Sequence, residues 1–457
     1  MSLDDNFLFQ IIIEPLMRLV INLNHLNSMS DNRKLPALFL LTSLLTGMLL
    51  VISCIKDPTL PAITTDEARE ITINSAIVDG NVTEDGGAEV TVRGICWGTG
   101  SMPTLDDSFK ASGTGPGEFS CTIEGLDPNT EYYARAFAEN SIGIAFGNEI
   151  AFKTGIAPPS VTTGQVSEIM ANSAVCSGII VYDGGAGITE KGICWSLTPE
   201  PDVQGSHTSI ATGSVTYTCT LSGLTAGTRY YARAYVKNQG GILAYGEQIV
   251  FNTKLADIEG NLYSVVYIGN QVWMVENLRT TKFNNNAPIP NITDNTEWLN
   301  LTGAAYCWYN NDIQYKSTFG ALYSWYTITD GDLCPTGWHV PSDDEYGTLE
   351  VYLGLNPDSV KVWGWRGTNQ GIQIKSTTGW EDGGNGTNTS GFTGLPGGFR
   401  YAAQGAFYSL GKLTYWWSSS ELNANEGWYR LIDNTNNDIY RATTSKKGGK
   451  YIRCVKN

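Results

Sequence analysis

Eleven of the thirteen tryptophans lie after residue 254, and several of them stand among polar residues and glycines. Sugars are bound by stacking their C–H faces on exposed aromatic rings, while carboxylate, amide and guanidinium groups take their hydroxyls. Trp, Tyr and Arg also dominate the binding energy of protein interfaces. We therefore predict a glycan- or protein-binding surface, with the core of a strand-poor domain as the alternative place for these rings. The candidate ligand-binding residues are Trp363, Trp365, Arg366, Trp380, Glu381, Asp382 and Trp428.

Conventional catalytic and metal motifs are absent from the sequence. The three histidines, His25, His207 and His339, include no pair with metal-ligand spacing, and no C-x-x-C, phosphate loop or G-x-S-x-G occurs. The segment EDGGNGTN, Glu381–Asn388, has oxygen ligands at alternating spacing that suit Ca²⁺, but it lacks the regular order of an EF-hand. We expect no catalytic residue and no cofactor, with Ca²⁺ at this loop as the alternative to an ordinary surface loop.

Nine cysteines occur in the chain. Cys96 and Cys121 are 25 residues apart, and Cys194 and Cys219 have the same separation at equivalent positions of an internal repeat. A duplicated pair in an exported protein predicts one disulfide in each repeat. Two buried thiols per repeat are the alternative, because free cysteine packs as a small hydrophobe. Cys176 has no counterpart in the first repeat and is expected to be a buried free thiol.

A leader is indicated near the N-terminus. After Met29, two basic residues precede the uncharged, leucine-rich run 35–52, which is followed by Ser53 and Cys54. The end of the run resembles a bacterial lipobox, whose cysteine is diacylated and becomes the first mature residue. We expect a lipoprotein signal peptide over 29–54, lipid attachment at Cys54, and a gene-model extension over 1–28. A transmembrane helix is the alternative, since 18 apolar residues can just span a bilayer.

The elements that carry these residues are organised around an internal repeat and one long C-terminal segment. RGICWGT (93–99) matches KGICWSL (191–197), and FSCTIEGLDPNTEYYARAFAEN (119–140) matches YTCTLSGLTAGTRYYARAYVKN (217–238), both at an offset of 98 residues. Short alternating runs rich in Val, Ile, Thr and Tyr predict antiparallel β structure. The G-L-x-x-x-T-x-Y-Y pattern resembles the tyrosine corner of fibronectin type III domains. We predict all-β fibronectin- or immunoglobulin-like sandwiches over 60–154 and 157–254.

A helix with a defined start is predicted inside CPTGWHVPSDDEYGTLEVYLG, Cys334–Gly354. Trp338 and His339 are expected in a short strand that Pro341 ends. Ser342 is a strong N-cap, and Glu345 stands three residues later, where it completes a capping box. Tyr346, Leu349 and Leu353 recur at helical spacing, and Gly354 is a natural C-terminal stop.

Residues 257–457 resemble the Fibrobacter succinogenes major paralogous domain family. The matching segments are DIEGNLYSVVYIGNQVWMVENLRTT (257–281), FGALYSWYT (319–327), CPTGWHVPSDDEY (334–346), GFTGLPGGFR (391–400), YWWSSSE (415–421) and YIRCVKN (451–457). Their layout is similar to the C-type-lectin-like fold of formylglycine-generating-type enzymes. The resemblance implies an α+β C-type-lectin-like domain over 255–457 and a disulfide between Cys334 and Cys454, which leaves Cys307 unpaired. Nothing beside Cys307 in the sequence would activate a thiolate, so we expect an inert thiol, with a redox centre as the alternative.

The net charge is −16, and residues 60–253 carry 9 basic against 21 acidic side chains. Such a balance disfavours binding to nucleic acid. We predict a lipid-anchored protein of the cell envelope, in the outer membrane and exposed at the surface. Its expected role is adhesion, with a glycan or a surface protein as ligand and the two sandwiches as spacers. The alternatives are an envelope enzyme, related to formylglycine-generating or glycan-processing enzymes, and a purely structural surface component.

Overall fold

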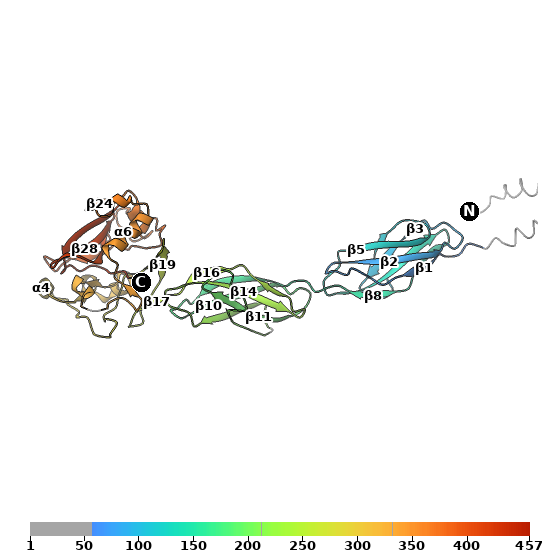
Figure 1. Cartoon of the computed structure of the whole chain (residues 1–457), viewed down its shortest axis with the longest axis horizontal. Helices are drawn as coiled ribbons and strands as arrows, with labels where there is room; N and C mark the ends of the chain where they lie inside the picture. Colours follow the sequence, from blue (N-terminus) through green and yellow to red (C-terminus); the bar gives the residue numbers. More distant parts are fainter. Residues whose placement is uncertain (1–56, 212, 331) are drawn as a thin grey trace, which may run out of the picture. The chain divides into compact units, whose positions relative to one another are not determined.

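The computed structural model describes residues 57–211, 213–330 and 332–457. The predicted signal peptide, its Cys54 and residues 1–28 lie outside the described residues. In the described part of the chain, no helix is long and apolar enough to cross a membrane. The chain divides into two compact units, Met1–Gly155 and Ile156–Asn457. The first unit contains one β-sandwich, and the second contains another sandwich and the C-terminal domain (Figure 1).

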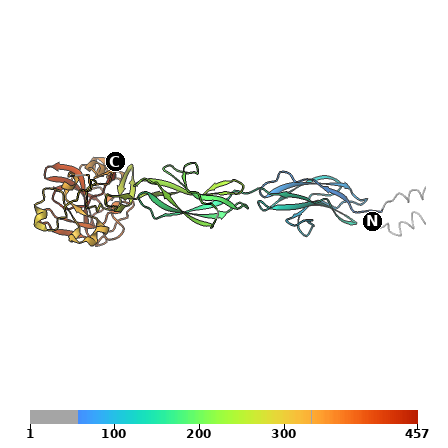
Figure 2. The same ribbon diagram turned by 90° about the horizontal axis from the view of Figure 1, so that it is seen from below.

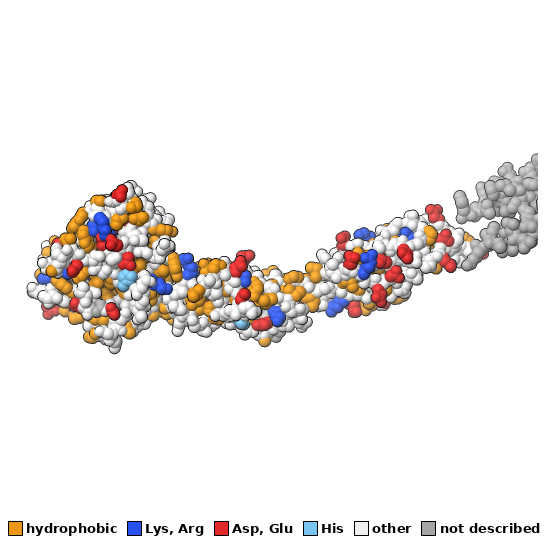
Figure 3. Space-filling view, in the orientation of Figure 1, with side chains coloured by type: hydrophobic (Ala, Val, Ile, Leu, Met, Phe, Trp, Pro, Cys, Tyr) orange, Lys and Arg blue, Asp and Glu red, His pale blue; other side chains and the backbone are white. Residues whose placement is uncertain are grey.

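The first sandwich consists of two antiparallel sheets (Figure 2). One sheet has the order β1-β2-β5, and the other has the order β4-β3-β6-β7 with β8 paired to β6. The strands are β1 (Ala62–Thr65), β2 (Ser75–Glu84), β3 (Val92–Gly98), β4 (Ser108–Ala111), β5 (Gly117–Glu124), β6 (Glu131–Asn140), β7 (Gly143–Phe146) and β8 (Ile150–Lys153). Acidic side chains are spread over this sandwich on the face shown in Figure 3, as the sequence composition predicts.

The second sandwich repeats this topology strand for strand. Its sheets have the orders β13-β10-β9 and β12-β11-β14-β15, with β16 paired to β14. The strands are β9 (Ser160–Ser167), β10 (Ser173–Tyr182), β11 (Ile188–Ser196), β12 (Ser206–His207), β13 (Thr216–Ser222), β14 (Arg229–Asn238), β15 (Leu243–Tyr245) and β16 (Ile249–Asn252). The predicted all-β sandwiches are confirmed.

The predicted tyrosine corner is present in both sandwiches. The hydroxyl of Tyr132 accepts a hydrogen bond of 3.0 Å from the backbone N–H of Asp127, and Tyr230 accepts one of 3.0 Å from Thr225. Asn140 is buried and donates to two backbone carbonyls that precede its strand, and Asn238 does the same in the second sandwich. The repeat is therefore preserved at the level of single hydrogen bonds.

The disulfides predicted within the sandwiches are not formed: Cys96, Cys121, Cys194 and Cys219 are buried free thiols. The reason is the alternation of side chains along a strand, which sends neighbours to opposite faces of the sheet. In the first sandwich Ile95 and Cys121 belong to the core between the sheets. Cys96, the neighbour of Ile95, instead points its Sγ toward the carbonyl of Pro103, at 3.3 Å.

The second sandwich places its thiols in the same way. Ile193 and Cys219 belong to the core, and Cys194 lies on the other face of strand β11. Cys176, the predicted buried free thiol, also lies in this core and is directly opposite Cys219 in the strand register.

The C-terminal domain combines several small sheets with short helices. Its strands are β17 (Leu255–Ala256), β18 (Leu262–Tyr263), β19 (Val265–Ile268), β20 (Gln271–Met274), β21 (Tyr306–Cys307), β22 (Leu322–Tyr323), β23 (Trp338–His339), β24 (Gly364–Arg366), β25 (Gly397–Arg400), β26 (Phe407–Leu410), β27 (Leu413–Asn423), β28 (Glu426–Asp433), β29 (Ile439–Ser445) and β30 (Val455–Lys456). The α-helices are α4 (Asn295–Leu299), α5 (Lys316–Phe319), α6 (Asp343–Tyr352) and α7 (Gln370–Ile374), and the 3-10 helices are η3 (Tyr309–Asn311), η4 (Ile313–Tyr315), η5 (Trp325–Ile328) and η6 (Pro357–Ser359).

The largest sheet of this domain has six strands in the order β24-β29-β28-β27-β25-β26. It separates two hydrophobic cores. One core contains Trp417, Tyr429, Leu431 and Ala442 on one face of the sheet. The other contains Trp416, Ile432 and Ile439 on the opposite face, together with Tyr346 and Leu349 of helix α6. Neighbouring residues of one strand, such as Trp416 and Trp417, therefore enter different cores.

Helix α6 begins and ends as the sequence predicts. The hydroxyl of Ser342 accepts from the N–H of Glu345 at 3.2 Å, and the Glu345 carboxylate accepts from the N–H of Ser342 at 2.8 Å, which forms the capping box. The apolar residues Tyr346, Leu349 and Leu353 are buried. The preceding short strand β23 pairs with β30, so this helix is fixed directly to the last strand of the chain.

Candidate functional site

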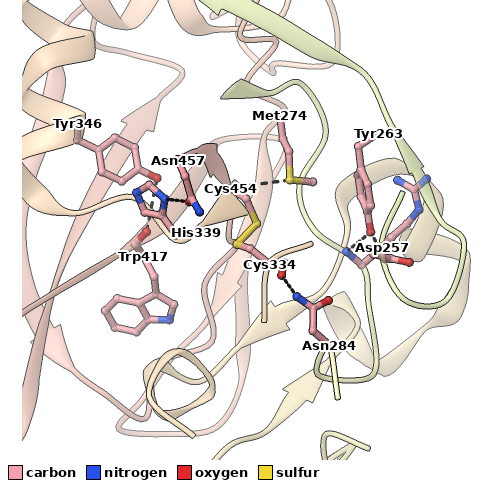
Figure 4. The surroundings of a disulfide bond; sticks show 11 residues. Asp257, Tyr263, Met274, Asn284, Cys334, His339, Tyr346, Trp417, Cys454 and Asn457 are labelled. Atoms are coloured by element: carbon pink, nitrogen blue, oxygen red, sulfur yellow. Dashed lines mark hydrogen bonds between the residues drawn. A yellow bond between two sulfur atoms is a disulfide. The ribbon is translucent and has the colours of Figure 1, made fainter. Parts of the chain in front are cut away.

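The disulfide between Cys334 and Cys454 is formed, as the family resemblance implied, and joins the approach of helix α6 to the last strand. Figure 4 shows it beside Met274, Asn284 and the side chains that surround it. A pocket of about 500 Å³ opens next to it. The lining includes Asn284, Asp332, His339, Ser419 and Asn457, along with the turn from Cys334 to Trp338.

His339 has fixed partners at the edge of this pocket. Its Nε2 lies 2.7 Å from the Glu345 carboxylate. Its Nδ1 lies 2.6 Å from the amide oxygen of Asn457 (Figure 4). Both ring nitrogens are thus occupied by groups of helix α6 and of the chain end. This arrangement suits a structural clasp, because neither nitrogen faces a nucleophile or an open ligand position.

Cys307 is buried and free, and it lies in the same hydrophobic core as Trp416, near Arg400. Burial raises the pKa of its thiol to about 12. The reactive thiolate is therefore suppressed, which supports the inert interpretation.

The structure brings Trp363 and Trp428 together, with ring centroids 4.6 Å apart. The guanidinium of Arg441 lies 3.5 Å from the centroid of the Trp428 ring. Trp363 is 53% exposed, whereas Trp428 is buried. These two predicted residues form a tryptophan pair on the same face of the six-stranded sheet as helix α6.

Arg366 does not line an exposed surface, which corrects the predicted ligand-binding role. It is buried, and its guanidinium donates to the Glu350 carboxylate at 2.5 Å. Glu350 also accepts from Arg430 at 2.6 Å, and Arg430 in turn reaches Asp343 at 2.8 Å. Arg441 completes this buried ion network through a 2.8 Å contact to Asp343. A charge that is removed from water needs such partners. Arg366 is therefore held by Glu350 inside the protein and is not available to a ligand at the surface.

Trp380, Glu381 and Asp382 lie away from the tryptophan pair. Trp380 is buried, and its indole N–H donates to Ser376 at 3.0 Å and to the carbonyl of Gly394 at 3.1 Å, so its predicted role as an exposed ring is wrong. Glu381 and Asp382 are exposed and face Lys412 at 3.7 and 3.6 Å. The predicted residues therefore do not converge on one concavity.

In the loop predicted as an alternative Ca²⁺ site, two amide oxygens accept backbone hydrogen bonds. The Asn385 side-chain oxygen accepts from the N–H of Trp380, and that of Asn388 accepts from the N–H of Thr393. Among the described residues, no group of three or more His, Cys, Asp or Glu side chains is arranged to hold a metal ion.

An aromatic surface that the sequence did not predict crosses the six-stranded sheet. Each strand contributes one ring, in the order of the strands themselves. We call this set the aromatic row: Trp365 on β24, Tyr440 on β29, Tyr429 on β28, Tyr415 on β27, Phe399 on β25 and Tyr408 on β26. Successive ring centroids are 5.2, 6.3, 5.1, 4.8 and 6.0 Å apart. Five strand intervals of about 4.8 Å give the row a length of about 24 Å.

Exposure of the aromatic row is greatest at its Tyr408 end. Tyr408 at one end is 39% exposed, and the adjacent Tyr401 is 42% exposed. Trp365, Tyr440, Tyr415 and Phe399 are partly exposed, and Tyr429 is buried. A shallow pocket of about 370 Å³ lies at the Tyr408 end, and its lining is Phe399, Tyr401, Gln404, Tyr408 and Ser409. The row is therefore a candidate binding surface, because contiguous apolar groups at a protein surface are uncommon without a function.

Trp365 is the only predicted residue in the row, although Trp363 stands two positions before it. In a regular strand these two side chains would share a face. Gly364 between them has a φ of 83°, which breaks that rule. Trp363 therefore contacts Trp428 on one face, while Trp365 contacts Tyr440 on the other. The glycine between the two tryptophans is the sequence feature that could have indicated their separation onto opposite faces.

The fold and the site define a protein with two β-sandwiches followed by a mixed domain that presents an aromatic surface. Residues 266–456 match the family model of the Fibrobacter succinogenes major domain, so the C-terminal domain belongs to this family. Among solved structures, the chain is similar to the crystal structure of the chicken CNTN1 FN1-FN3 domains. The sequence identity is 15%, the match covers 46% of this chain and 73% of that chain, and the TM-score is 0.27. No curated protein matches the chain.

Proposed function

We propose that this protein binds carbohydrate through the aromatic row of its C-terminal domain. The observation that carries the proposal is the row itself, in which six neighbouring strands each supply one ring. Flat rings contribute contact area at little cost in conformational entropy, because Tyr and Phe have only two side-chain torsions. A row of about 24 Å at strand spacing fits an extended oligosaccharide better than a single sugar.

The polar groups beside the row suit the same ligand. Tyr401, Gln404, Tyr408 and Ser409 surround the shallow pocket at one end, and their hydroxyl and amide groups can exchange hydrogen bonds with sugar hydroxyls. Binding sites of this type combine apolar rings with a few polar groups that fix orientation.

We further propose that the protein displays this domain from the cell envelope. Diacylation of Cys54 would anchor the chain in the outer membrane, and the sandwiches would serve as fibronectin type III-like spacers that carry a C-type-lectin-like domain. The support is the lipobox sequence, the duplicated tyrosine corner and the family membership. Adhesion to a glycan-bearing surface is the role that joins these features. Replacing Cys54 by Ala should abolish metabolic labelling by a fatty acid, and continued labelling would contradict the anchor.

Binding is tested with the full chain on an array of neutral and acidic oligosaccharides. The variant Tyr401→Ala/Tyr408→Ala should weaken binding at least tenfold, because each stacked ring contributes about 1–3 kcal/mol. Both side chains are exposed, so the fold should be retained. Tyr352→Ala is the matched control: Tyr352 is a 65% exposed ring on helix α6, outside the row. Equal loss in both variants, or unchanged binding in the double variant, would contradict the proposal.

A further inference from the structure

One buried cation touches the aromatic row and has no anionic partner among the described residues. Lys450 is 4% exposed. Its ammonium lies 3.9 Å from the ring centroid of Tyr415, 4.7 Å from Tyr429, 4.9 Å from Trp417 and 5.6 Å from Phe399. Three of these four rings belong to the row. No described residue accepts a hydrogen bond from its Nζ.

The other buried cations of the C-terminal domain, within the described residues, all donate to oxygen atoms. Arg366 and Arg430 donate to Glu350, Arg441 to Asp343, Lys446 to Glu421, Lys375 to the carbonyl of Asp433, Arg400 to the carbonyl of Gly405, and Arg453 to Asn277. A largely buried ammonium without an acceptor is costly, because most of its hydration is lost without replacement. Lys450 is the exception, and it is the cation that faces the proposed binding surface.

No acidic side chain of residues 57–211, 213–330 and 332–457 forms an ion pair with Lys450, and burial is the only cause of its pKa shift. The titratable side chains that face it are Tyr415 and Tyr429. Burial raises the pKa of Tyr415 to about 12 and raises that of Tyr429 as well, so both hydroxyls are neutral at physiological pH. Burial lowers the pKa of Lys450 to about 7. The four ring faces act in the opposite direction, because their quadrupoles stabilise the ammonium.

We propose that the carbohydrate bound on the aromatic row is acidic, and that its carboxylate pairs with the ammonium of Lys450. The inference rests on the proposed function and names the ligand class. Phe399 and Tyr415, two of the rings around Nζ, are partly exposed, so the carboxylate would approach the ammonium from their side. It supplies the acceptor that the protein omits at this position, while the neighbouring sugar faces stack on the rings. Most of the net charge of −16 belongs to the sandwiches, where 9 basic side chains stand against 21 acidic ones, a difference of −12. Repulsion of an anion by the C-terminal domain is therefore weak.

A proton links this pairing to pH. Below about pH 7 Lys450 is already protonated and the anion binds at full strength. At higher pH the amine of the free protein is neutral, so binding requires the uptake of one proton. The affinity for an acidic ligand should then fall by about tenfold for each pH unit above the lysine pKa, whereas the affinity for a neutral ligand should not change.

The experiment compares two probes of equal length, a galacturonic acid hexamer and a galactose hexamer, by calorimetry on the full chain. At pH 6 the acidic hexamer should bind at least tenfold more tightly, and this preference should shrink to less than twofold at pH 9. Lys450→Met, which keeps the length of the side chain and removes its charge, should abolish the preference at pH 6 and leave binding of the galactose hexamer unchanged. Lys412→Met is the matched control, because Lys412 is an exposed lysine of the same domain that faces Glu381 and Asp382.

The outcomes separate the two proposals. Equal binding of both hexamers at pH 6, with both lost in Tyr401→Ala/Tyr408→Ala, overturns the acidic ligand and leaves carbohydrate binding intact. Failure of either hexamer and of every array glycan to bind overturns the proposed function. If Lys450→Met does not fold, the pH dependence of the unchanged protein decides alone: a preference that persists at pH 9 overturns the role of Lys450.

Discussion

The two faces of the six-stranded sheet treat buried charge in different ways. On the helix α6 face, Arg366, Arg430 and Arg441 are neutralised by Asp343 and Glu350 within the protein. On the other face, Lys450 lies against the aromatic row without an acid beside it. Buried charges that are all paired within the protein stabilise the fold. A buried charge without a partner in the protein leaves a position for a charged ligand group. We therefore interpret the helix α6 face, which holds most of the tryptophans and arginines selected from the sequence, as structural. The opposite face, which holds the aromatic row, is the candidate binding surface.

The largest effect on stability should come from the disulfide that closes the core on the row side. Cys334 and Cys454 belong to the same core as Trp417 and Tyr429 and are 120 residues apart. Cys334→Ala/Cys454→Ala should lower the free energy of unfolding by about 4–5 kcal/mol in the chain-entropy description. Denaturant unfolding of the full chain, followed by tryptophan fluorescence of the C-terminal domain, measures this change.

A reductant provides the control for the free thiols of the sandwiches. Dithiothreitol should destabilise the C-terminal transition and leave the sandwich transitions unchanged, since Cys96, Cys121, Cys194 and Cys219 are unbonded. A fall in sandwich stability under reduction would show that these cysteines are paired after all.

The helix α6 face should be the more sensitive to the loss of one acid. Asp343→Ala leaves Arg430 and Arg441 without their shared carboxylate and should cost about 3–5 kcal/mol. Asp344→Ala, at the next position, removes an exposed carboxylate that pairs with Lys361 and should cost less than about 1 kcal/mol. Similar losses in the two variants, measured by denaturant unfolding, would contradict a structural role for the buried ion network.

The same face should be sensitive to acid. Burial alone would raise the pKa of Asp343, but hydrogen bonds from Arg441 and the charge of Arg430 hold it well below its ordinary value. The unfolded carboxyl titrates near pH 4. The contribution of this pair is thus complete above about pH 4 and is lost as pH falls further. Thermal unfolding between about pH 5 and pH 2 should show this loss in the parent protein and not in Asp343→Ala.

On the face of the aromatic row, stability should instead change at alkaline pH. The pKa of Lys450 is lowered to about 7, whereas an unfolded lysine titrates near 10.4. Between these values the unfolded state binds more protons, so stability should rise with pH by up to a few kcal/mol. Lys450→Met should remove this rise, and Lys412→Met should retain it. A flat profile in the parent protein would contradict the lowered pKa of Lys450 and, with it, the expected pH dependence of binding.

Local sequence patterns were sufficient for the sandwiches and for helix α6. Tyr132, Tyr230 and the capping box of Ser342 and Glu345 act through neighbours a few residues away, so a motif contains the whole interaction. The disulfide prediction in the repeats failed because the spacing of two cysteines does not indicate which face of the sheet each side chain lies on. Ile95 enters the core, which sends Cys96 outward.

The aromatic row could not be predicted, because its order follows the sheet and not the chain. Strands β24 and β29 are neighbours although some seventy residues of sequence separate Trp365 from Tyr440. β25 joins β27 in a parallel pair. No alternation within one strand shows that six strands will each turn a ring to the same face. The burial of Arg366 likewise depends on Glu350, which lies on a different element.

The smallest expected effect separates the two faces most directly. Trp363 is the most exposed tryptophan of the predicted set, and its ring contacts Trp428 on the helix α6 face. If the row binds the ligand, Trp363→Ala should change carbohydrate affinity by less than twofold, whereas Trp365→Phe should weaken it measurably because a smaller ring remains in the row. Calorimetry with the same hexamers measures both. A large loss from Trp363→Ala, with unchanged unfolding and with little effect from Tyr401→Ala/Tyr408→Ala, would move the binding surface to the tryptophan pair. The paired charges beneath that pair would then support a ligand site, and the unpaired Lys450 would be a feature of the core.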